Sequence, residues 1–571
     1  MKPQDPLALA VFGAALALAA AALGTNVLAQ PQEAATARRF MVAAANPHAV
    51  DAGVEALRTG GSALDAAIAV QMVLGLVEPQ SSGIGGGAFL LHWSRAEQRV
   101  RSYDGRETAP AAARPERFLD ASGKPLALAE AIASGRSVGV PGVLRMLEAA
   151  HRRHGRIVWG KLFDPAIRLA EQGFALSPRL HRFLDADVLL REDPAARALY
   201  YDPDGRPRPV GTRIVNAEYA ATLRSIASFG ADAFYSGAIA QDIVRAVVAH
   251  RRPGDLALED LARYQALERE PLCGGYRGRR VCSMGPPAGG VTLLQMLGIL
   301  ERTPWHRAAP GSAEAVHLFS EAARLAYADR ARYVADPAFV PQPVAGLLEP
   351  GYLEARARQI GERSTGRAEP GAPRGAAATL GARAGVEAAG TSHVSIVDAR
   401  GDAVAMTTTI ESPFGSRILV RGFLLNNELT DFSFVRESGG RALANSVEAG
   451  KRPRSAMSPT LVFGRDGALQ AVLGSAGGAV IIGYVAKTLV AMLDWGLDAQ
   501  GAVSLPNFGS RNGPTEIERG SAYESLAPAL RERGHEVIFL DMTSGTHAIE
   551  RTADGWRGGA DPRREGVARG D

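Results

Sequence analysis

The 571-residue chain contains very little cysteine. Its two cysteines, Cys273 and Cys282, are too few for a disulfide-stabilised scaffold or a four-cysteine zinc site. They flank the segment GGYRGRRV, whose glycines and arginines indicate a turn between two short strands. A hairpin disulfide and two free thiols are both compatible with this arrangement.

The chain also lacks a surplus of charge of one sign. It carries 64 basic and 60 acidic side chains, which gives a formal net charge of +4. Only five of the basic residues are lysines, and the arginines are scattered among acids, so a phosphate-binding stripe for nucleic acid is not expected. With 46% hydrophobic and 22% charged residues, the composition is that of a globular protein and not of a disordered one.

Long hydrophobic runs are missing everywhere except at the N-terminus. An apolar run from Leu7 to Leu23 follows Lys2, and Val27-Leu28-Ala29 resembles a small-residue cleavage site. Residues 1–29 are therefore predicted to be an export signal, and the mature protein is predicted to be periplasmic or secreted, without a stable membrane span. An uncleaved anchor remains the alternative, because the run approaches the minimum length of a span.

The first half of the chain alternates between helical and extended patterns. Residues 47–59 show helical spacing of apolar side chains, and Ser62 caps a second, uniformly apolar segment that predicts a buried helix. Residues 81–93 and 99–110 read as strands joined by glycine-rich turns. Residues 126–360 are predicted to be largely helical, with short strands near the two cysteines.

Three motifs suggest chemistry that their surroundings do not support. Gly83–Gly87 (GIGGG) follows a helix and precedes a strand, the reverse of a dinucleotide-binding fingerprint. It therefore predicts only that the backbone here passes close to another part of the molecule. Ser137 lies in a G-x-S-x-G sequence without the buried strand that a nucleophile elbow requires. His151 and His154 lie among arginines without a carboxylate to complete a metal site, and solvated surface is expected there.

The composition changes most sharply before the last third of the chain. Residues 361–390 are rich in glycine, alanine and proline and show no apolar periodicity, so they predict a flexible tether. The next segment, TSHVSIVDARGDAVAMTTTIES, alternates in hydropathy and predicts two strands around an Arg-Gly-Asp turn. A tether that runs directly into a strand beginning with Thr391 is the most informative feature of the sequence.

Further motifs surround this feature in a fixed order. They are Asp104-Gly105-Arg106-Glu107, Gly139-Val140-Pro141-Gly142, LLNNELTDFS (Leu424–Ser433), KRPRSAMSPT (Lys451–Thr460), GSAGGA (Gly474–Ala479) and a C-terminal DPRREG. On these motifs, the chain from Ala43 onward resembles γ-glutamyltransferase (glutathione hydrolase) precursors of the N-terminal-nucleophile hydrolase superfamily. The resemblance implies an α+β fold, the four-layer αββα sandwich, built from a large subunit (residues 30–390) and a small catalytic subunit (residues 391–571) of one precursor.

The resemblance also implies how the chemistry is carried out, without a metal or a cofactor. The precursor would cleave itself between Gly390 and Thr391, and the new α-amine of Thr391 would serve as the base for its own hydroxyl. An α-amine pKa of roughly 7.7–8.0 leaves a neutral fraction for this task. Thr409 would orient the hydroxyl, and the backbone N–H groups of Gly477 and Gly478 would form an oxyanion hole at a helix N-terminus.

The same resemblance assigns the groups that recognise a γ-glutamyl substrate. Arg106 and Ser455 would bind its α-carboxylate, and the acids Glu428 and Asp431 would bind its α-ammonium group. The chain departs from the family at two positions. Glu411 replaces a usual asparagine and adds an acid beside the ammonium site, and Ala456 replaces a usual serine and removes a carboxylate donor.

These residues predict a γ-glutamyltransferase that takes γ-glutamyl groups from glutathione or related amides and passes them to water, an amino acid or a peptide. A cephalosporin (glutaryl) acylase of the same superfamily is the near alternative, although a glutaryl group has no ammonium for the acids to bind. A secreted binding protein that never cleaves itself and a serine esterase built on Ser137 are more distant alternatives. Residues 434–450 are glycine-rich and are expected to act as a lid.

Overall fold

The structure, a computed structural model, describes residues 33–377, 379–383 and 390–571. The predicted export signal at residues 1–29 lies outside the described residues, as does the end of the predicted tether at 384–389. Residues 34–571 form one compact unit. Within the described part of the chain, no helix combines the length and the hydropathy needed to span a bilayer.

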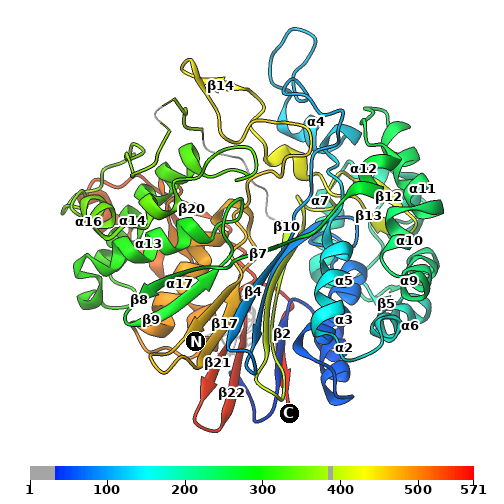
Figure 1. Ribbon diagram of the computed structural model, residues 1–571, viewed down its shortest axis with the longest axis horizontal. Helices are drawn as coiled ribbons and strands as arrows, with labels where there is room; N and C mark the ends of the chain where they lie inside the picture. The colour runs from blue at the N-terminus through cyan, green and yellow to red at the C-terminus, as the bar shows by residue number, and fades with distance from the viewer. Residues whose placement is uncertain (1–32, 378, 384–389) are drawn as a thin grey trace, which may run out of the picture. The chain divides into compact units, whose positions relative to one another are not determined.

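Two seven-stranded antiparallel sheets lie face to face inside this unit (Figure 1). In spatial order, the first sheet contains β23 (Val567–Gly570), β2 (Met41–Ala44), β10 (Gly390–Val397), β11 (Ala403–Glu411), β3 (Gly87–Ser94), β4 (Arg99–Gly105) and β7 (Leu267–Arg269). The second sheet contains β1 (Ala35–Ala37), β22 (Gly555–Ala560), β21 (His547–Thr552), β17 (Leu469–Gly474), β16 (Thr460–Phe463), β9 (Arg279–Ser283) and β8 (Leu272–Tyr276).

Helices cover the outer face of each sheet. Those over the first sheet include α2 (Pro47–Arg58), α3 (Ala63–Val77) and α5 (Val143–His154), and those over the second include α13 (Gly290–Glu301), α14 (Ala313–Tyr333) and α17 (Ile481–Leu493). Alternation along a strand sends successive side chains to opposite faces. Leu90 of β3 accordingly packs with the helices, and its neighbours Phe89 and Leu91 pack between the sheets. The predicted αββα sandwich is confirmed.

The remaining elements lie around the two sheets. The helices are α4 (Leu128–Ile132), α6 (Asp164–Gln172), α7 (Pro178–Ala186), α8 (Pro194–Tyr200), α9 (Ala217–Phe229), α10 (Asp232–Tyr235), α11 (Gly237–Val248), α12 (Leu258–Arg263), α15 (Val344–Leu347), α16 (Pro350–Ala357), α18 (Ala499–Ser504) and α19 (Ala527–Glu532). The strand groups are β5 (Phe174–Ala175) with β6 (Arg213–Ile214), β12 (Leu419–Val420) with β13 (Phe423–Leu424), β14 (Glu437–Ser438) with β15 (Arg441–Ala442), and β18 (Phe508–Gly509) with β19 (Thr515–Glu518) and β20 (Val537–Leu540).

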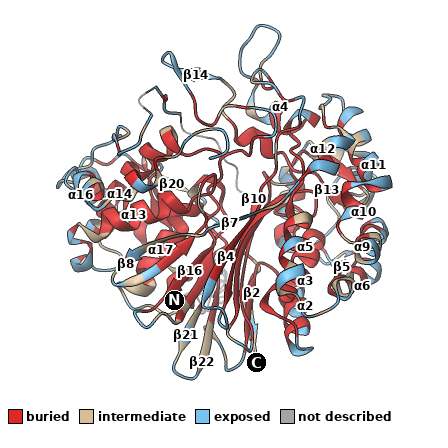
Figure 2. Ribbon diagram, viewed as in Figure 1, coloured by how far each residue is buried: buried red, intermediate tan, exposed pale blue. Residues whose placement is uncertain are grey.

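Local sequence signals account for the elements nearest the site. Ser62 accepts a hydrogen bond from the Asp65 backbone N–H, and the Asp65 side chain accepts one from Ser62, so a capping box starts α3 where the sequence predicts. All of α3 is buried. Figure 2 shows the same concentration of buried residues in both sheets and on the helix faces turned toward them.

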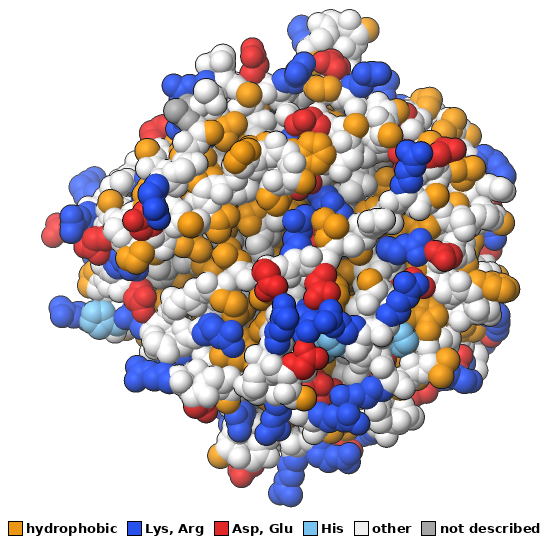
Figure 3. All heavy atoms as spheres, viewed as in Figure 1, with side chains coloured by type: hydrophobic (Ala, Val, Ile, Leu, Met, Phe, Trp, Pro, Cys, Tyr) orange, Lys and Arg blue, Asp and Glu red, His pale blue; other side chains and the backbone are white. Residues whose placement is uncertain are grey.

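Charged side chains of both signs are spread over the face drawn in Figure 3, and the basic ones are more numerous in its lower half. The two cysteines face each other across the β8–β9 hairpin and form a disulfide between Cys273 and Cys282. The predicted turn between short strands is therefore confirmed. Of the two alternatives that the sequence left open, a hairpin disulfide and two free thiols, the structure has the disulfide.

The prediction that His151 and His154 lie in solvated surface is wrong. They lie at the C-terminal end of α5, where the neighbouring arginines are exposed and the two imidazoles turn inward. His154 Nε2 lies 2.8 Å from the Tyr103 hydroxyl, and its ring stacks on His92. Burial lowers the pKa of His154 to about 4, so this imidazole is neutral near neutral pH.

Residues 361–377 and 379–383 form no helix and no regular strand, in keeping with their composition. They are nevertheless held to the core, which the lack of apolar periodicity did not predict. The side chain of Glu321 in α14 accepts hydrogen bonds from Ser364 and Thr365, and Ala368 is buried. Backbone and hydroxyl groups can anchor a segment that has few apolar side chains to bury.

The turn at Gly83–Gly87 makes the close backbone approach that the sequence predicts. A Cβ atom on Gly86 would lie 2.0 Å from the carbonyl oxygen of Thr409, and one on Gly85 would lie 2.2 Å from that of Leu424. Both contacts are to backbone atoms that cannot swing away. The turn therefore fixes how closely the end of β11 approaches the start of β3.

Gly86→Ala is expected to destabilise the fold because the added methyl group must displace the β11 backbone. Forced overpacking of this kind typically costs ~1–3 kcal/mol. Thermal denaturation followed by circular dichroism should show a clear fall in Tm for this variant. Gly351→Ala is the control, because a Cβ there meets nothing within 4 Å. Equal Tm values for the two variants would contradict the close approach.

Candidate active site

Thr391 stands at the start of β10, at the end of the first sheet. Across the β10–β11 pair, Gly390 faces Glu411 and Thr391 faces Thr409, with a register shift between Gly390 and Thr391. Alternation places Thr391 on the same face as Ser395, whose hydroxyl donates to a β21 carbonyl in the second sheet. The Thr391 hydroxyl is therefore directed between the two sheets.

The hydroxyl of Thr409 connects Thr391 with the peptide bond that precedes it. It donates to the carbonyl oxygen of Gly390 at 2.6 Å and accepts from the backbone N–H of Glu411 at 2.8 Å. A hydroxyl has one proton to donate, so at 3.3 Å the Thr391 hydroxyl is the donor and Thr409 Oγ1 the acceptor. Thr409 thus polarises the Gly390 carbonyl and directs the Thr391 oxygen.

A small cavity, the Thr391 pocket, collects most of the residues predicted from the sequence. Its volume is about 20 Å³, close to that of one water molecule. It is lined by Arg106, Thr391, Thr409, Glu411, Glu428, Asp431, Ser455, Ala456, Met457, Gly478 and Ile481. Segments from both halves of the chain therefore converge on the hydroxyl of one threonine.

Arg106 lies fully buried in the wall of this pocket and is paired with two acids. Its guanidinium contacts Glu428 and lies 2.6 Å from Asp431, and it also donates to the carbonyl oxygens of Pro453 and Arg454. Burial acts to lower the pKa of Arg106, but the neighbouring carboxylates raise it above its usual value. The arginine stays charged, and in the uncleaved chain it is neutralised by the acids predicted to bind an ammonium group.

Glu107 belongs to the same charge cluster, and the sequence analysis did not predict a role for it. The side chain is fully buried, and burial raises the pKa of Glu107 to about 7 against the opposing effect of Arg106. Burial likewise raises the pKa of Glu428 well above its usual value. More carboxyl groups than guanidinium groups meet here, so the cluster retains protons near neutral pH. The position of Glu107 directly after Arg106 in the motif Asp-Gly-Arg-Glu is the sequence feature that could have indicated its place in this cluster.

The two departures from the family pattern both face the pocket. Glu411 adopts a positive φ of 78°, and its carboxylate accepts a hydrogen bond from Asn427. Ala456 is buried beside Ser455 and contributes only a methyl group. Both positions that depart from the family pattern therefore lie in the wall of the Thr391 pocket.

The two glycines predicted to form an oxyanion hole follow the end of strand β17, three and four residues after Gly474. Gly477 and Gly478 have φ values of 129° and 59°, conformations that favour glycine. Gly477 is the N-cap and Gly478 the first residue of the short helix η6 (Gly478–Val480), which continues into α17. Gly478 lines the Thr391 pocket and Gly477 lies next to it in the chain, without lining the pocket itself.

Arg564, in the DPRREG motif, is a further residue that the sequence analysis left without a role. It is buried, and its Nη1 donates to the carbonyl oxygen of Thr391 at 2.7 Å. Burial lowers the pKa of Arg564 to about 9. This contact holds the backbone of Thr391 from the side opposite Gly390.

Residues 434–450, predicted as a lid, carry the exposed β14–β15 hairpin. Asn445 in this segment bridges two parts of the site. Its side chain donates to the carbonyl of Asp431 at 2.7 Å and accepts from the backbone N–H of Arg454 at 3.0 Å. The loop is therefore fastened to both predicted substrate-binding motifs.

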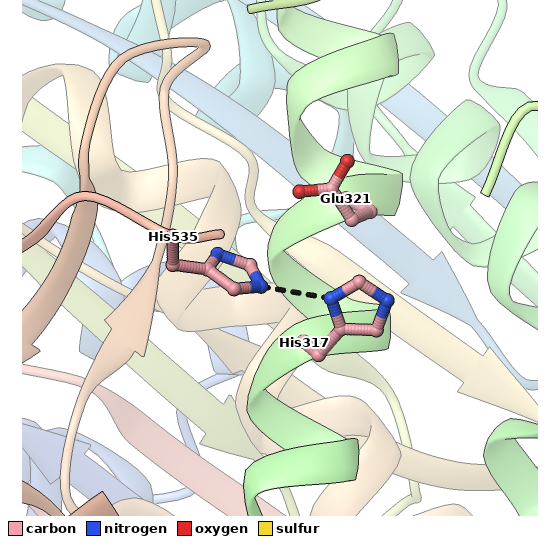
Figure 4. Close-up of side chains that lie close together, drawn as sticks. All are labelled: His317, Glu321 and His535. Carbon is pink, nitrogen blue, oxygen red and sulfur yellow. Dashed lines mark hydrogen bonds between the residues drawn. The ribbon is translucent and has the colours of Figure 1, made fainter. Parts of the chain in front are cut away.

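His317, Glu321 and His535 are the one group of ligand-type side chains whose spacing suits a metal ion within the described ranges (Figure 4). Their ligand atoms already have protein partners. His317 Nδ1 and His535 Nε2 lie 2.8 Å apart and share a hydrogen bond, and Glu321 accepts from Arg324 at 2.9 Å. A guanidinium in contact with the carboxylate opposes a cation, so the geometry is that of an internal hydrogen-bond network.

Arg106→Met is expected to destabilise the protein by about 3–5 kcal/mol, because it leaves the buried carboxyl groups without their guanidinium. Without that charge, the pKa values of Glu107 and Glu428 rise further. The folded state then binds protons more tightly than the unfolded state, so the free energy of unfolding increases as the pH falls. Urea unfolding should therefore show that Arg106→Met loses more unfolding free energy, relative to the unaltered protein, at pH 8 than at pH 5.

Arg99→Met is the matched control, since Arg99 forms an exposed ion pair with Glu270. Such pairs contribute roughly 0–1 kcal/mol. Its unfolding midpoint should stay close to that of the unaltered protein at both pH values. A pH-independent loss in Arg106→Met would show that the carboxyl groups do not depend on this guanidinium.

Comparison with known proteins agrees with this geometry. The family model for Gamma-glutamyltranspeptidase matches residues 49–570. The chain is 35% identical over 544 residues to a glutathione hydrolase proenzyme of Bacillus subtilis, covering 93% of this chain and 91% of the relative. It is 36% identical over 542 residues to the glutathione hydrolase proenzyme of Escherichia coli, covering 92% and 91% of the two chains.

Among solved structures, the cephalosporin acylase from Bacillus halodurans superposes with a TM-score of 0.82 at 26% sequence identity, covering 96% of this chain and 98% of that one. The two sheets and their helical layers are thus those of an established enzyme fold. The match of the family model and the two relatives extends across almost the whole described unit. The chain belongs to the γ-glutamyltranspeptidase family.

Proposed function

We propose that the protein is a self-cleaving γ-glutamyltransferase and glutathione hydrolase. In this proposal the chain is cut between Gly390 and Thr391, and Thr391 then accepts the γ-glutamyl group of glutathione or a related amide and passes it to water, an amino acid or a peptide. The observation that carries the proposal is the position of the Thr409 hydroxyl, which donates to the Gly390 carbonyl while it accepts from Thr391.

Self-cleavage begins with attack of Thr391 Oγ1 on the carbonyl carbon of Gly390. The carbon–nitrogen bond breaks as the nitrogen takes up a proton, which leaves an ester between Gly390 and the threonine side chain. Water then hydrolyses the ester to a free carboxylate and a free α-amine. Glycine suits position 390, because a Cβ there would lie 2.5 Å from the Glu411 carbonyl oxygen.

The new α-amine supplies the base for the second reaction. It removes the proton from the Thr391 hydroxyl as that oxygen attacks the γ-carbonyl of the substrate, and it returns the proton to the leaving amine. The negative charge on the tetrahedral oxygen falls near Gly477 and Gly478, where the start of a helix offers unpaired N–H groups. One such donor typically lowers the barrier by ~3–4 kcal/mol.

Substrate recognition follows from the charge cluster in the wall of the Thr391 pocket. A γ-glutamyl group is a zwitterion, so its carboxylate can replace an acid beside Arg106 while its ammonium neutralises the displaced acid. Glu411, Glu428 and Asp431 supply three acids for one ammonium group. This exchange conserves net charge, which a buried site requires.

The glutaryl acylase alternative is less well supported by this chemistry. A glutaryl group carries the carboxylate but not the ammonium, so it would add a negative charge beside the acids at 411, 428 and 431 without bringing a cation. Burying that additional charge opposes binding.

The proposal places the mature protein in the periplasm or outside the cell, on the strength of the sequence at residues 1–29. The disulfide between Cys273 and Cys282 supports this location, because such bonds persist in oxidising compartments.

Thr391→Ala is expected to remain a single full-length chain without activity, because the attacking hydroxyl is gone. Intact mass measured under denaturing conditions distinguishes one chain from two. Thr409→Val should also remain largely uncleaved, and Thr409→Ser should cleave, because serine restores the donor to Gly390. Two chains in Thr391→Ala would disprove self-cleavage by this hydroxyl.

The double change Glu411→Asn with Ala456→Ser is expected to improve turnover of glutathione. The added serine hydroxyl supplies a hydrogen bond to the substrate carboxylate, and a bond to a charged group contributes ~1.5 kcal/mol or more. The KM for glutathione should fall roughly tenfold. An unchanged KM in the double variant and in each single variant would mean that these positions do not set substrate preference.

A further inference from the structure

Arg564 brings a buried positive charge to Thr391 that the proposed reaction does not use. The guanidinium comes from the DPRREG motif, in the connection between β22 and β23. Its Nη1 donates to the Thr391 carbonyl oxygen at 2.7 Å, and its Nη2 donates to that of Thr543 at 3.3 Å. Gly545 leaves room for it, because a Cβ there would collide with Nε. Arg564 is thus held against the backbone of the residue that becomes the new N-terminus.

The charge of Arg564 is not neutralised by a carboxylate in contact with it. Among the described residues, the acids that stabilise this charge are Glu78 and Asp561, and both act from a distance. Glu78 lies 3.5 Å from Arg179, and Asp561 forms an ion pair with Arg563 at 3.0 Å. The guanidinium is still ionised near neutral pH, because burial lowers the pKa of Arg564 only to about 9. An ionised group without a counter-ion in contact exerts its charge on the other groups around it.

The α-nitrogen of Thr391 lies close to this charge. Three bonds join it to the carbonyl oxygen of the same residue, so the two atoms are at most ~4 Å apart. Because Nη1 contacts that oxygen at 2.7 Å, the guanidinium lies within ~7 Å of the nitrogen. Cleavage breaks the bond on the other side of the nitrogen, and the pairing of β10 with β11 and β2 continues beyond the cut. The new amine therefore remains near Arg564.

Burial favours the neutral form of this amine, and the charges in the Thr391 pocket largely balance. Thr391 is only 3% exposed, so an ammonium group there would lose its hydration. In the pocket wall, Arg106 is paired with Glu428 and Asp431. Glu411 is the remaining acid of the lining, and its carboxylate opposes Arg564 because it favours an ammonium group.

The other titratable side chains near this end of β10 carry no charge. Burial lowers the pKa of His393 and of His547 below the usual value, so both imidazoles are neutral near neutral pH. Burial raises the pKa of Tyr484, which keeps its phenol protonated. The guanidinium of Arg564 is therefore the charge whose removal should change the state of the amine most directly.

We infer that Arg564 keeps the α-amine of mature Thr391 in its neutral, proton-accepting form, so that the nucleophile works at a lower pH than an ordinary N-terminal threonine would. The inference rests on the proposed function, since the amine exists only after cleavage. Arg564 contacts the backbone carbonyl and not the reacting atoms, so it is a positioning residue that also sets the charge of the base. Two cations at this distance in a buried site repel each other, which disfavours protonation of the amine.

The test follows carbamylation of the Thr391 α-amine by cyanate in the mature wild-type protein, because cyanate reacts with neutral amines. The mass of the peptide that begins at Thr391 reports this label separately from the lysines. The synthetic peptide Thr-Ser-His-Val has the same first four residues and is labelled in the same tube as the unfolded reference. The pH of half-maximal labelling should be about one unit lower for the protein than for the peptide.

Arg564→Gln removes the charge and should still be cleaved into two chains, because Gly390, Thr391 and Thr409 keep their mutual contacts. Its pH of half-maximal labelling should be about one unit higher than that of the wild type. Arg564→Lys keeps a cation and should stay close to the wild type. The acid limb of p-nitroaniline release from γ-glutamyl-p-nitroanilide should move with the labelling, which a purely structural role of Arg564 would not cause.

Arg356→Gln is the matched control, because it removes another buried guanidinium, one that lies on α16 and pairs with Asp329. It should lower Tm and leave the pH of half-maximal labelling unchanged. Three results would each overturn the inference alone: equal values for the wild type and the peptide, a wild-type value in Arg564→Gln, or an uncleaved Arg564→Gln. A wild-type chain without a new N-terminus at Thr391, or a processed one that releases no p-nitroaniline, would instead overturn the proposed function.

Discussion

The pairing of β10 with β11 is the constraint on which the rest of the site depends. Its register sets Thr391 opposite Thr409 and brings Gly390 within reach of the same hydroxyl. The bulge at Gly390 lets the backbone leave the sheet at the residue that the proposed reaction attacks. The turn at Gly83–Gly87 and the guanidinium of Arg564 fix this pair from two further sides. Catalytic geometry here is a property of strand register.

Electrostatic balance among the buried charges of the Thr391 pocket is the second constraint. Arg106 cannot remain buried without Glu428 and Asp431, and those acids cannot ionise without Arg106. A ligand that enters must therefore bring both charges, which makes zwitterion recognition a consequence of burial.

The sequence predicted local structure well where a regular period or a cap was present. The β10 and β11 strands and the helices α2 and α3 follow directly from alternation, helical spacing and the cap at Ser62. The layer order and the convergence of Arg106 with residues 428–455 came from the family resemblance, because periodicity does not say which distant segments meet. Glu107, Arg564 and the inward turn of His154 were missed for the same reason. Their importance lies in contacts with residues far away in the chain, and no local pattern encodes those contacts.

The interleaving of strands has a consequence for how such a protein can be assembled. In the first sheet, β2 from before residue 390 lies between β23 and β10 from after it, and β3 pairs with β11. In the second sheet, β1 pairs with β22 and β9 pairs with β16 across the same division. Two polypeptides made separately would each expose unpaired strand edges on both sheets and would aggregate before they met. Folding as one chain, with the cut made afterwards, provides each half with its partner at a ratio of one to one and makes the association effectively permanent.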